Sequence, residues 1–132
     1  MHVRVHLLAG LAFLVGCRSA QPDTPEDAYR AFAAAANKGE DAAAFARLSS
    51  QTQTAMKQVL GDLSIASGGS LKQDTAALVF GGARGAPLAS VRVLRMQPGE
   101  ATVSVTARDQ TREVTLKREG NEWRIELPVG PP

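Results

Sequence analysis

The spacing of apolar residues changes once along this chain of 132 residues, and this change restricts the fold more than any other feature of the sequence. From residue 24 to about residue 63, apolar side chains recur every three or four positions, as on one face of a helix. From residue 91 to residue 127 they recur every second position, as on one face of a strand. Helices followed by short strands predict an α+β domain, in which N-terminal helices pack on an antiparallel sheet of about four strands.

The first expected helix has both of its ends marked in the sequence. Thr24 is suited to cap its N-terminus, Pro25 fits its first position, and Gly39 is suited to end it. Its apolar stripe consists of Tyr29, Phe32, Ala33 and Ala36. This stripe predicts the face of the helix that packs on the sheet.

Two further helices and one ambiguous segment are expected before the strands. The second helix is expected over residues 41–48, and the third begins near Ser50. A glycine inside a helix costs about 1 kcal/mol, so an end of the third helix at Gly61 is one alternative. Residues 74–80 fit either a short helix or a buried strand, because periodicity does not distinguish the two.

Four expected strands span residues 91–97, 102–107, 113–117 and 122–127. In the last three, one face is apolar and the other is polar or charged, which is typical of a sheet covered on one side only. The first strand departs from this pattern, because Val91 and Val93 oppose Leu94 and Met96. Either a β-bulge or cover on both faces would explain the departure.

An uncharged apolar run, residues 7–15, follows a short N-terminal segment whose one fixed charge is Arg4. A basic start, a short apolar run and small residues before a cleavage site are typical of a secretory signal. The run is too short to span a bilayer, which takes about 20 residues. A buried core helix is the alternative, and the polar, proline-containing segment that follows disfavours it.

Leu14, Val15, Gly16 and Cys17 end the apolar run and resemble the lipobox of bacterial lipoprotein signals. The resemblance implies that a diacylglyceryl group is added to the sulfur of Cys17, that cleavage follows just before it, and that its amino group is then acylated. Anchoring by two or more acyl chains is stable, so the lipid membrane is the first expected partner. In enteric bacteria an Asp after the cysteine favours inner-membrane retention, so Arg18 favours the periplasmic side of the outer membrane.

These features divide the chain into a signal peptide over residues 1–16, a polar tether over 17–23, a single α+β domain over 24–128 and a C-terminal tail over 129–132. Both histidines lie in the signal, and acylation consumes the only cysteine. Catalysis by Ser-His-Asp or Cys-His sets, the usual zinc sites and an internal disulfide are then excluded. No catalytic residue, metal or other cofactor is therefore expected, and the interspersed charges indicate no nucleic-acid partner.

The segments TPEDAYRAFAAAANKGEDAAAFARLS and REVTLKREGNEWRIELP, within residues 24–128, resemble small bacterial lipoproteins with a nuclear-transport-factor-2-like domain. The resemblance implies a cone, in which a curved antiparallel sheet wraps around the N-terminal helices and leaves a pocket at its open end. Members of that superfamily include enzymes, binding modules and docking domains, so the fold does not assign a function.

Tyr29 and Trp123 are the candidate pocket residues. Ketosteroid isomerases of this fold pair a tyrosine with a carboxylate, so a catalytic donor is one alternative for Tyr29. The sequence assigns no second donor and no acid to a pocket with Tyr29, so a position in the core or at its rim is expected. Trp123 shares the apolar face of the last strand with Ile125 and Leu127. Packing in the core is therefore expected for Trp123, and stacking on a ligand is the alternative.

The expected function is not catalytic: the anchored domain binds a small ligand or an envelope protein at the open end of the cone. An enzyme that works with two carboxylates and a structural spacer of the envelope are the alternatives. Six arginines lie on or near the strands among glutamates: Arg92, Arg95, Arg108, Arg112, Arg118 and Arg124. They are expected to form cross-strand charge pairs on a solvated face, worth about 0.2–1 kcal/mol each. Binding of an anionic envelope polymer is the alternative role for them.

Overall fold

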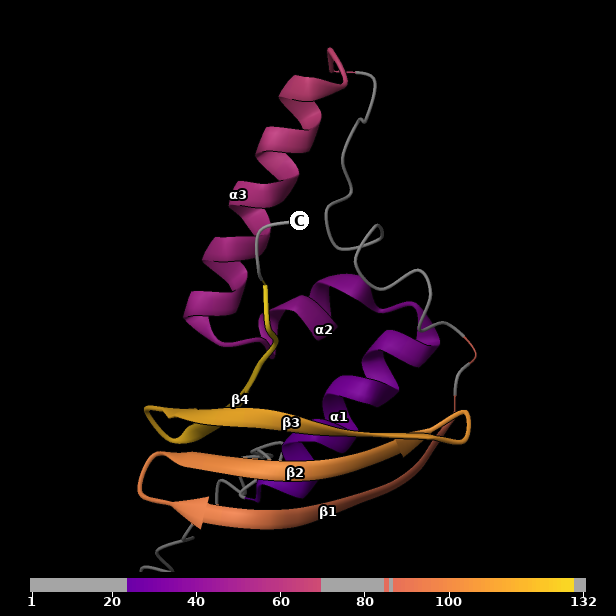
Figure 1. Ribbon diagram of the computed structural model, residues 1–132, viewed down its shortest axis with the longest axis vertical. Helices are drawn as coiled ribbons and strands as arrows, with labels where there is room; N and C mark the ends of the chain where they lie inside the picture. The colour runs from indigo at the N-terminus through magenta and orange to yellow at the C-terminus, as the bar shows by residue number, and fades with distance from the viewer. Residues whose placement is uncertain (1–23, 70–84, 86, 130–132) are drawn as a thin grey trace, which may run out of the picture.

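The computed structural model describes residues 24–69, 85 and 87–129 of the chain. Its elements are α1 (Pro25–Lys38), α2 (Asp41–Ala46), α3 (Ser50–Ala66), β1 (Leu88–Gln97), β2 (Glu100–Ala107), β3 (Gln110–Glu119) and β4 (Glu122–Glu126). Helices followed by four antiparallel strands confirm the expected α+β arrangement (Figure 1). The expected signal peptide, lipobox and tether, residues 74–80 and most of the C-terminal tail lie outside the described residues.

Helix α1 begins and ends at the residues that the sequence marks. The Thr24 hydroxyl accepts the backbone N–H of Asp27 at 3.1 Å, and Pro25 follows in the first helical position. Gly39 ends the helix with a φ of 77°, a left-handed conformation that glycine adopts without strain. The buried face comprises Pro25, Ala28, Tyr29, Phe32, Ala35 and Ala36.

Helix α2 ends earlier than expected, and α3 continues past Gly61, where one alternative had it end. Helix α2 ends at Ala46 because Leu48 forms a parallel bridge with Ile125 of β4, which requires an extended backbone. Helix α3 runs through Gly61 to Ala66, so the helix does not end at the glycine. Gly61 is exposed with open space around it, and the helix tolerates the small cost of its flexibility there.

The sheet is a meander in which consecutive strands are neighbours, in the order β1-β2-β3-β4. Gly99 and Gly120 lie in two of its turns with φ of 78° and 61°. In the β2–β3 turn, Arg108 and Asp109 both have positive φ, as two-residue hairpin turns of the mirror-image type require.

The irregular pattern of β1 has its cause in a bulge. The register of β1 against β2 shifts between Val93 and Arg95, so Leu94 has no partner across the ladder. Leu94 and Met96 are 40% and 57% exposed, so described residues do not bury the second face of β1. Of the two explanations that the sequence left open, the structure has the bulge.

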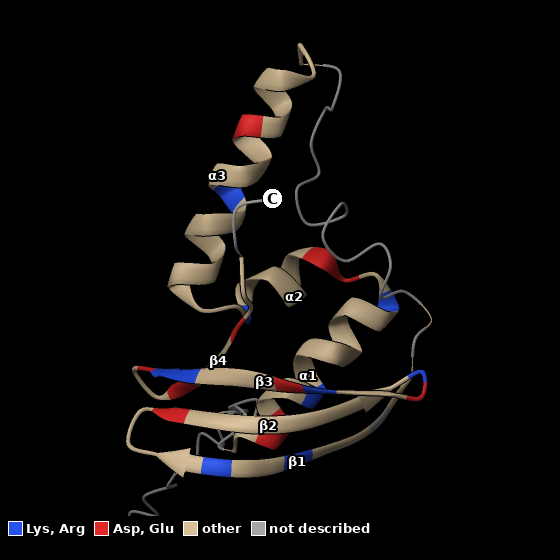
Figure 2. Ribbon diagram, in the orientation of Figure 1, with Lys and Arg blue, Asp and Glu red and all other residues tan. Residues whose placement is uncertain are grey.

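Figure 1 shows α1 against one face of the sheet, behind the strands in this view, whereas α3 rises beyond β4 and extends away from the strands. The core lies between α1 and the sheet, and its most buried side chains from the sheet are Val103, Leu116 and Ile125. Residues of both charges are spread along the strands (Figure 2), and the pairs of Arg95 with Glu113 and of Lys117 with Glu100 lie on the face opposite the core. One covered face and one solvated face are what the alternation in the sequence predicts.

Candidate functional site

Strand β4 accompanies β3 for only part of its length. The two strands pair from Thr115↔Glu126 to Glu119↔Glu122, and β4 then leaves the sheet. Among the described residues, no strand lies beside the remaining stretch of β3, residues 110–114, on that edge. A wedge therefore opens between the free edge of β3 and the chain that follows β4.

A buried hydroxyl holds the departing chain. The Oγ1 atom of Thr52, in the first turn of α3, accepts the backbone N–H of Leu127 at 3.1 Å and the Ser49 hydroxyl at 2.8 Å. Thr52 is 2% exposed. The Leu127 N–H lies on the edge of β4 that faces away from β3, as the Ile125 N–H does, so this contact ties the end of β4 to α3.

The other edge of β4 is closed by the linker between α2 and α3. The Ser49 N–H donates to the Ile125 carbonyl at 2.8 Å, and the Ile125 N–H donates to the Arg47 carbonyl at 3.0 Å. The start of α3 is thereby bound to β4 by main-chain hydrogen bonds. The walls of the wedge are held together by contacts between residues far apart in sequence.

A groove of about 640 Å³ occupies this wedge, and we call it the β3–α3 groove. Its lining residues are Gln51, Thr52, Ala55, Arg112, Glu113, Val114, Thr115, Glu126, Leu127, Pro128 and Val129. Sites for small ligands are clefts of about 300–1,000 Å³ with mainly apolar walls and a few polar groups. The β3–α3 groove has that size, and Ala55, Val114, Leu127, Pro128 and Val129 give it an apolar part.

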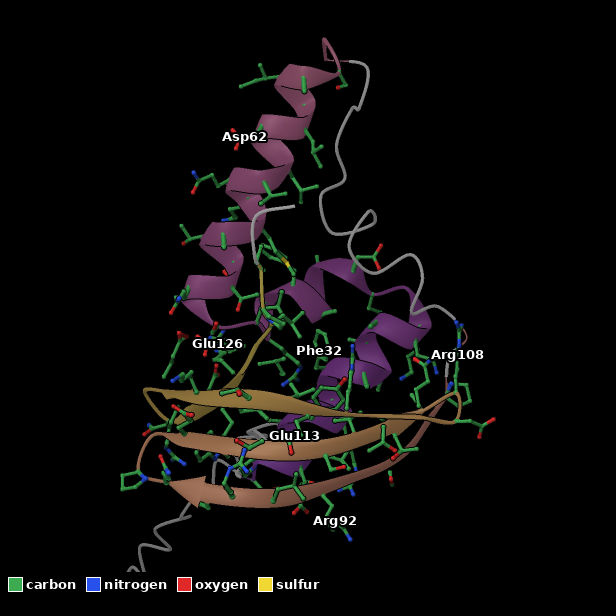
Figure 3. All side chains as sticks on the ribbon, viewed as in Figure 1. Phe32, Asp62, Arg92, Arg108, Glu113 and Glu126 are labelled. Atoms are coloured by element: carbon green, nitrogen blue, oxygen red, sulfur yellow. The ribbon has the colours of Figure 1, made fainter. Side chains whose placement is uncertain are left out.

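The charged residues of the groove lie on two different faces of the sheet. Arg112 is paired with the buried Val105, so its side chain is on the face covered by the helices. Glu113 is paired with Ser104 on the open face, and there its carboxylate lies 3.4 Å from the Arg95 guanidinium. Glu126, labelled with Glu113 in Figure 3, lies 3.9 Å from Lys117. Both glutamates therefore lie near a cation on the open face, and Glu126 shares Lys117 with Glu100.

Lys117 is the centre of the charges on the open face. Its Nζ lies 2.5 Å from the Glu100 carboxylate as well as 3.9 Å from that of Glu126. The hydrogen bond to Glu100 raises the pKa of Lys117 above its ordinary value of 10.5. The pair of Arg95 with Glu113 is a cross-strand pair of the kind that the sequence predicts for the arginines. The same expectation is wrong for Arg112, which lies on the helix-covered face and donates to Tyr29.

Tyr29 is a core residue, as expected, with one polar contact that the sequence did not reveal. It is 3% exposed, and its ring packs edge-to-face against Phe32 with centroids 5.6 Å apart. Its hydroxyl accepts a hydrogen bond from Nη2 of Arg112 at 3.1 Å. Tyr29 does not line the β3–α3 groove, but the arginine that it holds does.

Trp123 is also a core residue and lies outside the groove. It is 7% exposed on the helix-covered face of β4, and the guanidinium of Arg118 lies 5.5 Å from its ring centroid. Neither candidate pocket residue is therefore a wall of the β3–α3 groove. The groove is built instead chiefly from Thr52, Val114 and Leu127, for which the sequence predicts no functional role, together with Arg112.

One signal in the sequence does point to the groove. Arg112 stands two residues before Val114 and four before Leu116, so it lies on the same face of β3 as these two buried residues, and Arg118 does so too. A charged residue on that face has to reach solvent or a polar partner at the edge of the core. The other walls depend on where β4 leaves β3, which periodicity does not indicate.

Over the residues that the structure describes, no group of three or more histidine, cysteine or acidic side chains is placed to hold a metal ion. Within the same residues, no helix is long and apolar enough to cross a membrane. Two acids, Glu113 and Glu126, do line one groove, but each is paired with a cation rather than with the other acid. This arrangement does not favour an enzyme that works with two carboxylates.

Comparison of the chain with protein-family models, curated proteins and solved structures found no match. Function therefore has to be inferred from the sequence and from the geometry of the groove.

Proposed function

We propose that this protein is a lipid-anchored lipoprotein of the bacterial envelope whose domain binds a small ligand in the β3–α3 groove without catalysing a reaction. The observation that carries the proposal for the domain is the groove itself. Its volume of about 640 Å³ and the apolar part of its walls suit a small molecule with an apolar part. The pairing of both groove acids with cations on the open face supports binding rather than acid–base chemistry.

The resemblance to nuclear-transport-factor-2-like lipoproteins supports the same proposal. In a cone, helices cover one face of the sheet and a pocket lies where the sheet opens. Here α1 covers one face, and the groove lies where β4 parts from β3. A cone-like domain with its pocket at this end is therefore part of the proposal.

The anchor rests on the sequence, in which Leu14, Val15, Gly16 and Cys17 end an apolar run. Metabolic labelling with a palmitate analogue and detergent phase separation test it. We expect the wild-type chain to incorporate the label and enter the detergent phase, and the Cys17→Ser chain to do neither. A wild-type chain that stays in water, or that retains Met1, would contradict the anchor.

Filling the groove tests the role of the domain. Ala55 lies on the wall that α3 contributes, so Ala55→Trp places a large ring in the groove. Gln58→Trp is the matched control, because Gln58 is an exposed residue of the same helix and is not a wall of the groove. The probe is Nile red, a neutral apolar dye, added to the unacylated full chain with Cys17→Ser in each protein.

We expect Nile red fluorescence to rise with the parent chain and with Gln58→Trp, and to stay low with Ala55→Trp. Binding by Ala55→Trp equal to that of the parent would show that the dye occupies another place. Loss of binding in both tryptophan variants would attribute the effect to the helix surface rather than to the groove. Either result would remove the support for the proposed site.

A further inference from the structure

We propose that the ligand of the β3–α3 groove is an amphipathic carboxylate, an organic acid with an apolar chain, and that Arg112 binds its carboxylate group. This inference rests on the proposed function, since it names the chemical class that the same groove takes. Tyr29 has the role of a positioning residue, because it holds Arg112 and does not itself line the groove.

The charge on the helix-covered side of the groove is that of Arg112. Glu113 and Glu126 have their cations, Arg95 and Lys117, on the opposite face of the sheet. No carboxylate of the residues that the structure describes forms an ion pair with Arg112. A guanidinium without an internal carboxylate, beside apolar walls, favours an anionic group on the ligand.

The hydrogen bond to Tyr29 leaves most of the guanidinium available. Arginine has five N–H donors in a planar fork, and one nitrogen of Arg112, Nη2, is engaged by the Tyr29 hydroxyl. The residue is exposed, so its other donors can reach a ligand. A carboxylate is the group that such a fork binds through two parallel hydrogen bonds.

The buried tyrosine reduces the cost of ordering this arginine. The Tyr29 ring is fixed by burial and by its contact with Phe32, so its hydroxyl is a stationary acceptor. A long side chain that is held before binding loses less conformational entropy when the ligand arrives. The 3.1 Å hydrogen bond therefore prepares Arg112 for an anion at the groove.

The apolar walls of the groove determine the second part of the ligand, which is its apolar chain. Val114 follows Arg112 on the same face of β3, about 7 Å along the strand. Leu127 and Ala55 line the same groove. A carboxylate at Arg112 would place an alkyl chain along Val114, where its burial adds about 0.8 kcal/mol for each methylene group.

The experiment compares three ligands of equal chain length: octanoate, octanol and octylammonium. Their affinities for the unacylated full chain are measured by isothermal titration calorimetry. We expect octanoate to bind about tenfold more tightly than octanol, and octylammonium to bind more weakly than either, as a charge-assisted hydrogen bond at Arg112 requires.

Substitutions then assign the preference to the arginine. Arg112→Met should weaken octanoate binding about tenfold and leave octanol binding unchanged, and Arg112→Lys should keep part of the preference. Tyr29→Phe should weaken octanoate binding a few-fold without changing octanol binding, a selectivity that a general loss of packing does not produce. Arg92→Met is the matched control, since Arg92 projects from β1 away from the helices (Figure 3) and should change neither affinity.

The outcomes separate this inference from the proposed function. Equal binding of octanoate and octanol that is insensitive to Arg112→Met, but blocked by Ala55→Trp, would overturn the choice of carboxylate and leave the groove as the site. Tighter binding of octylammonium would overturn the choice of charge. Absence of binding by all three ligands and by Nile red would overturn both proposals.

Discussion

Replacement of Thr52 by valine probes the contact that ties the end of β4 to α3 beside the groove. Valine has nearly the same shape as threonine but cannot accept a hydrogen bond, so Thr52→Val removes the acceptor of the Leu127 N–H and of the Ser49 hydroxyl. A lost hydrogen bond costs about 0.5–1.5 kcal/mol, and a donor left buried costs about 1–3 kcal/mol. The Ser49 hydroxyl can rotate whereas the Leu127 N–H cannot, so we expect the free energy of unfolding to fall by about 2–3 kcal/mol.

Urea denaturation followed by circular dichroism measures this change. For a domain of this size, the expected loss lowers the urea midpoint by about 1–2 M. Thr52→Ser is the control, because it keeps the hydroxyl and loses one methyl group, which costs about 1 kcal/mol. A valine variant as stable as the wild type, or more stable than the serine variant, would refute the reasoning that the hydroxyl holds β4 to α3.

The remaining predictions concern stability and use the same denaturation assay. Leu116→Ala, at a fully buried position, should cost about 2–5 kcal/mol. Gly120→Ala should cost about 1–2 kcal/mol because its φ is 61°, whereas Gly61→Ala, in an exposed helical position, should stabilise the domain by about 0.5–1 kcal/mol. Because folding raises the pKa of Lys117 above 10.5, its pair with Glu100 stabilises the domain below that pH and is lost as pH rises through the raised pKa. Between about pH 9 and about pH 12, the free energy of unfolding should therefore fall less in the Glu100→Gln variant than in the wild type. An equal fall in both proteins would contradict the assignment of this pH dependence to the pair.

Features of the fold that depend on neighbouring residues could be predicted from the sequence. Thr24 and Gly39 bound the first helix because caps act within one turn, and alternation identified the strands and their solvated face. Val93 and Leu94 are consecutive apolar residues, which a regular strand would point to opposite faces. This indicated an irregularity, and the structure has a bulge there. The length of α2 was not predictable in this way, because it is set by the bridge between Leu48 and Ile125.

The groove depends on contacts between distant parts of the chain. Thr52 and Leu127 are 75 residues apart, and nothing in the first turn of a helix indicates which backbone its hydroxyl will meet. The pairing of Tyr29 with Arg112 spans 83 residues. The alternation in the sequence does place Arg112 on the inward face of β3, but Arg118 shares that face, so alternation does not identify Arg112 as a wall of a groove.

The central claim, that the β3–α3 groove holds the ligand, is tested most directly by nuclear magnetic resonance of the ¹⁵N-labelled, unacylated full chain during titration with octanoate. We predict that the amide signals of Thr52, Ala55, Val114 and Leu127 shift together and saturate at one dissociation constant. The signal of Ser104, on the open face of the sheet, should stay in place. Shifts confined to the open face or to the far half of α3, with the four groove signals unmoved, would contradict the claim.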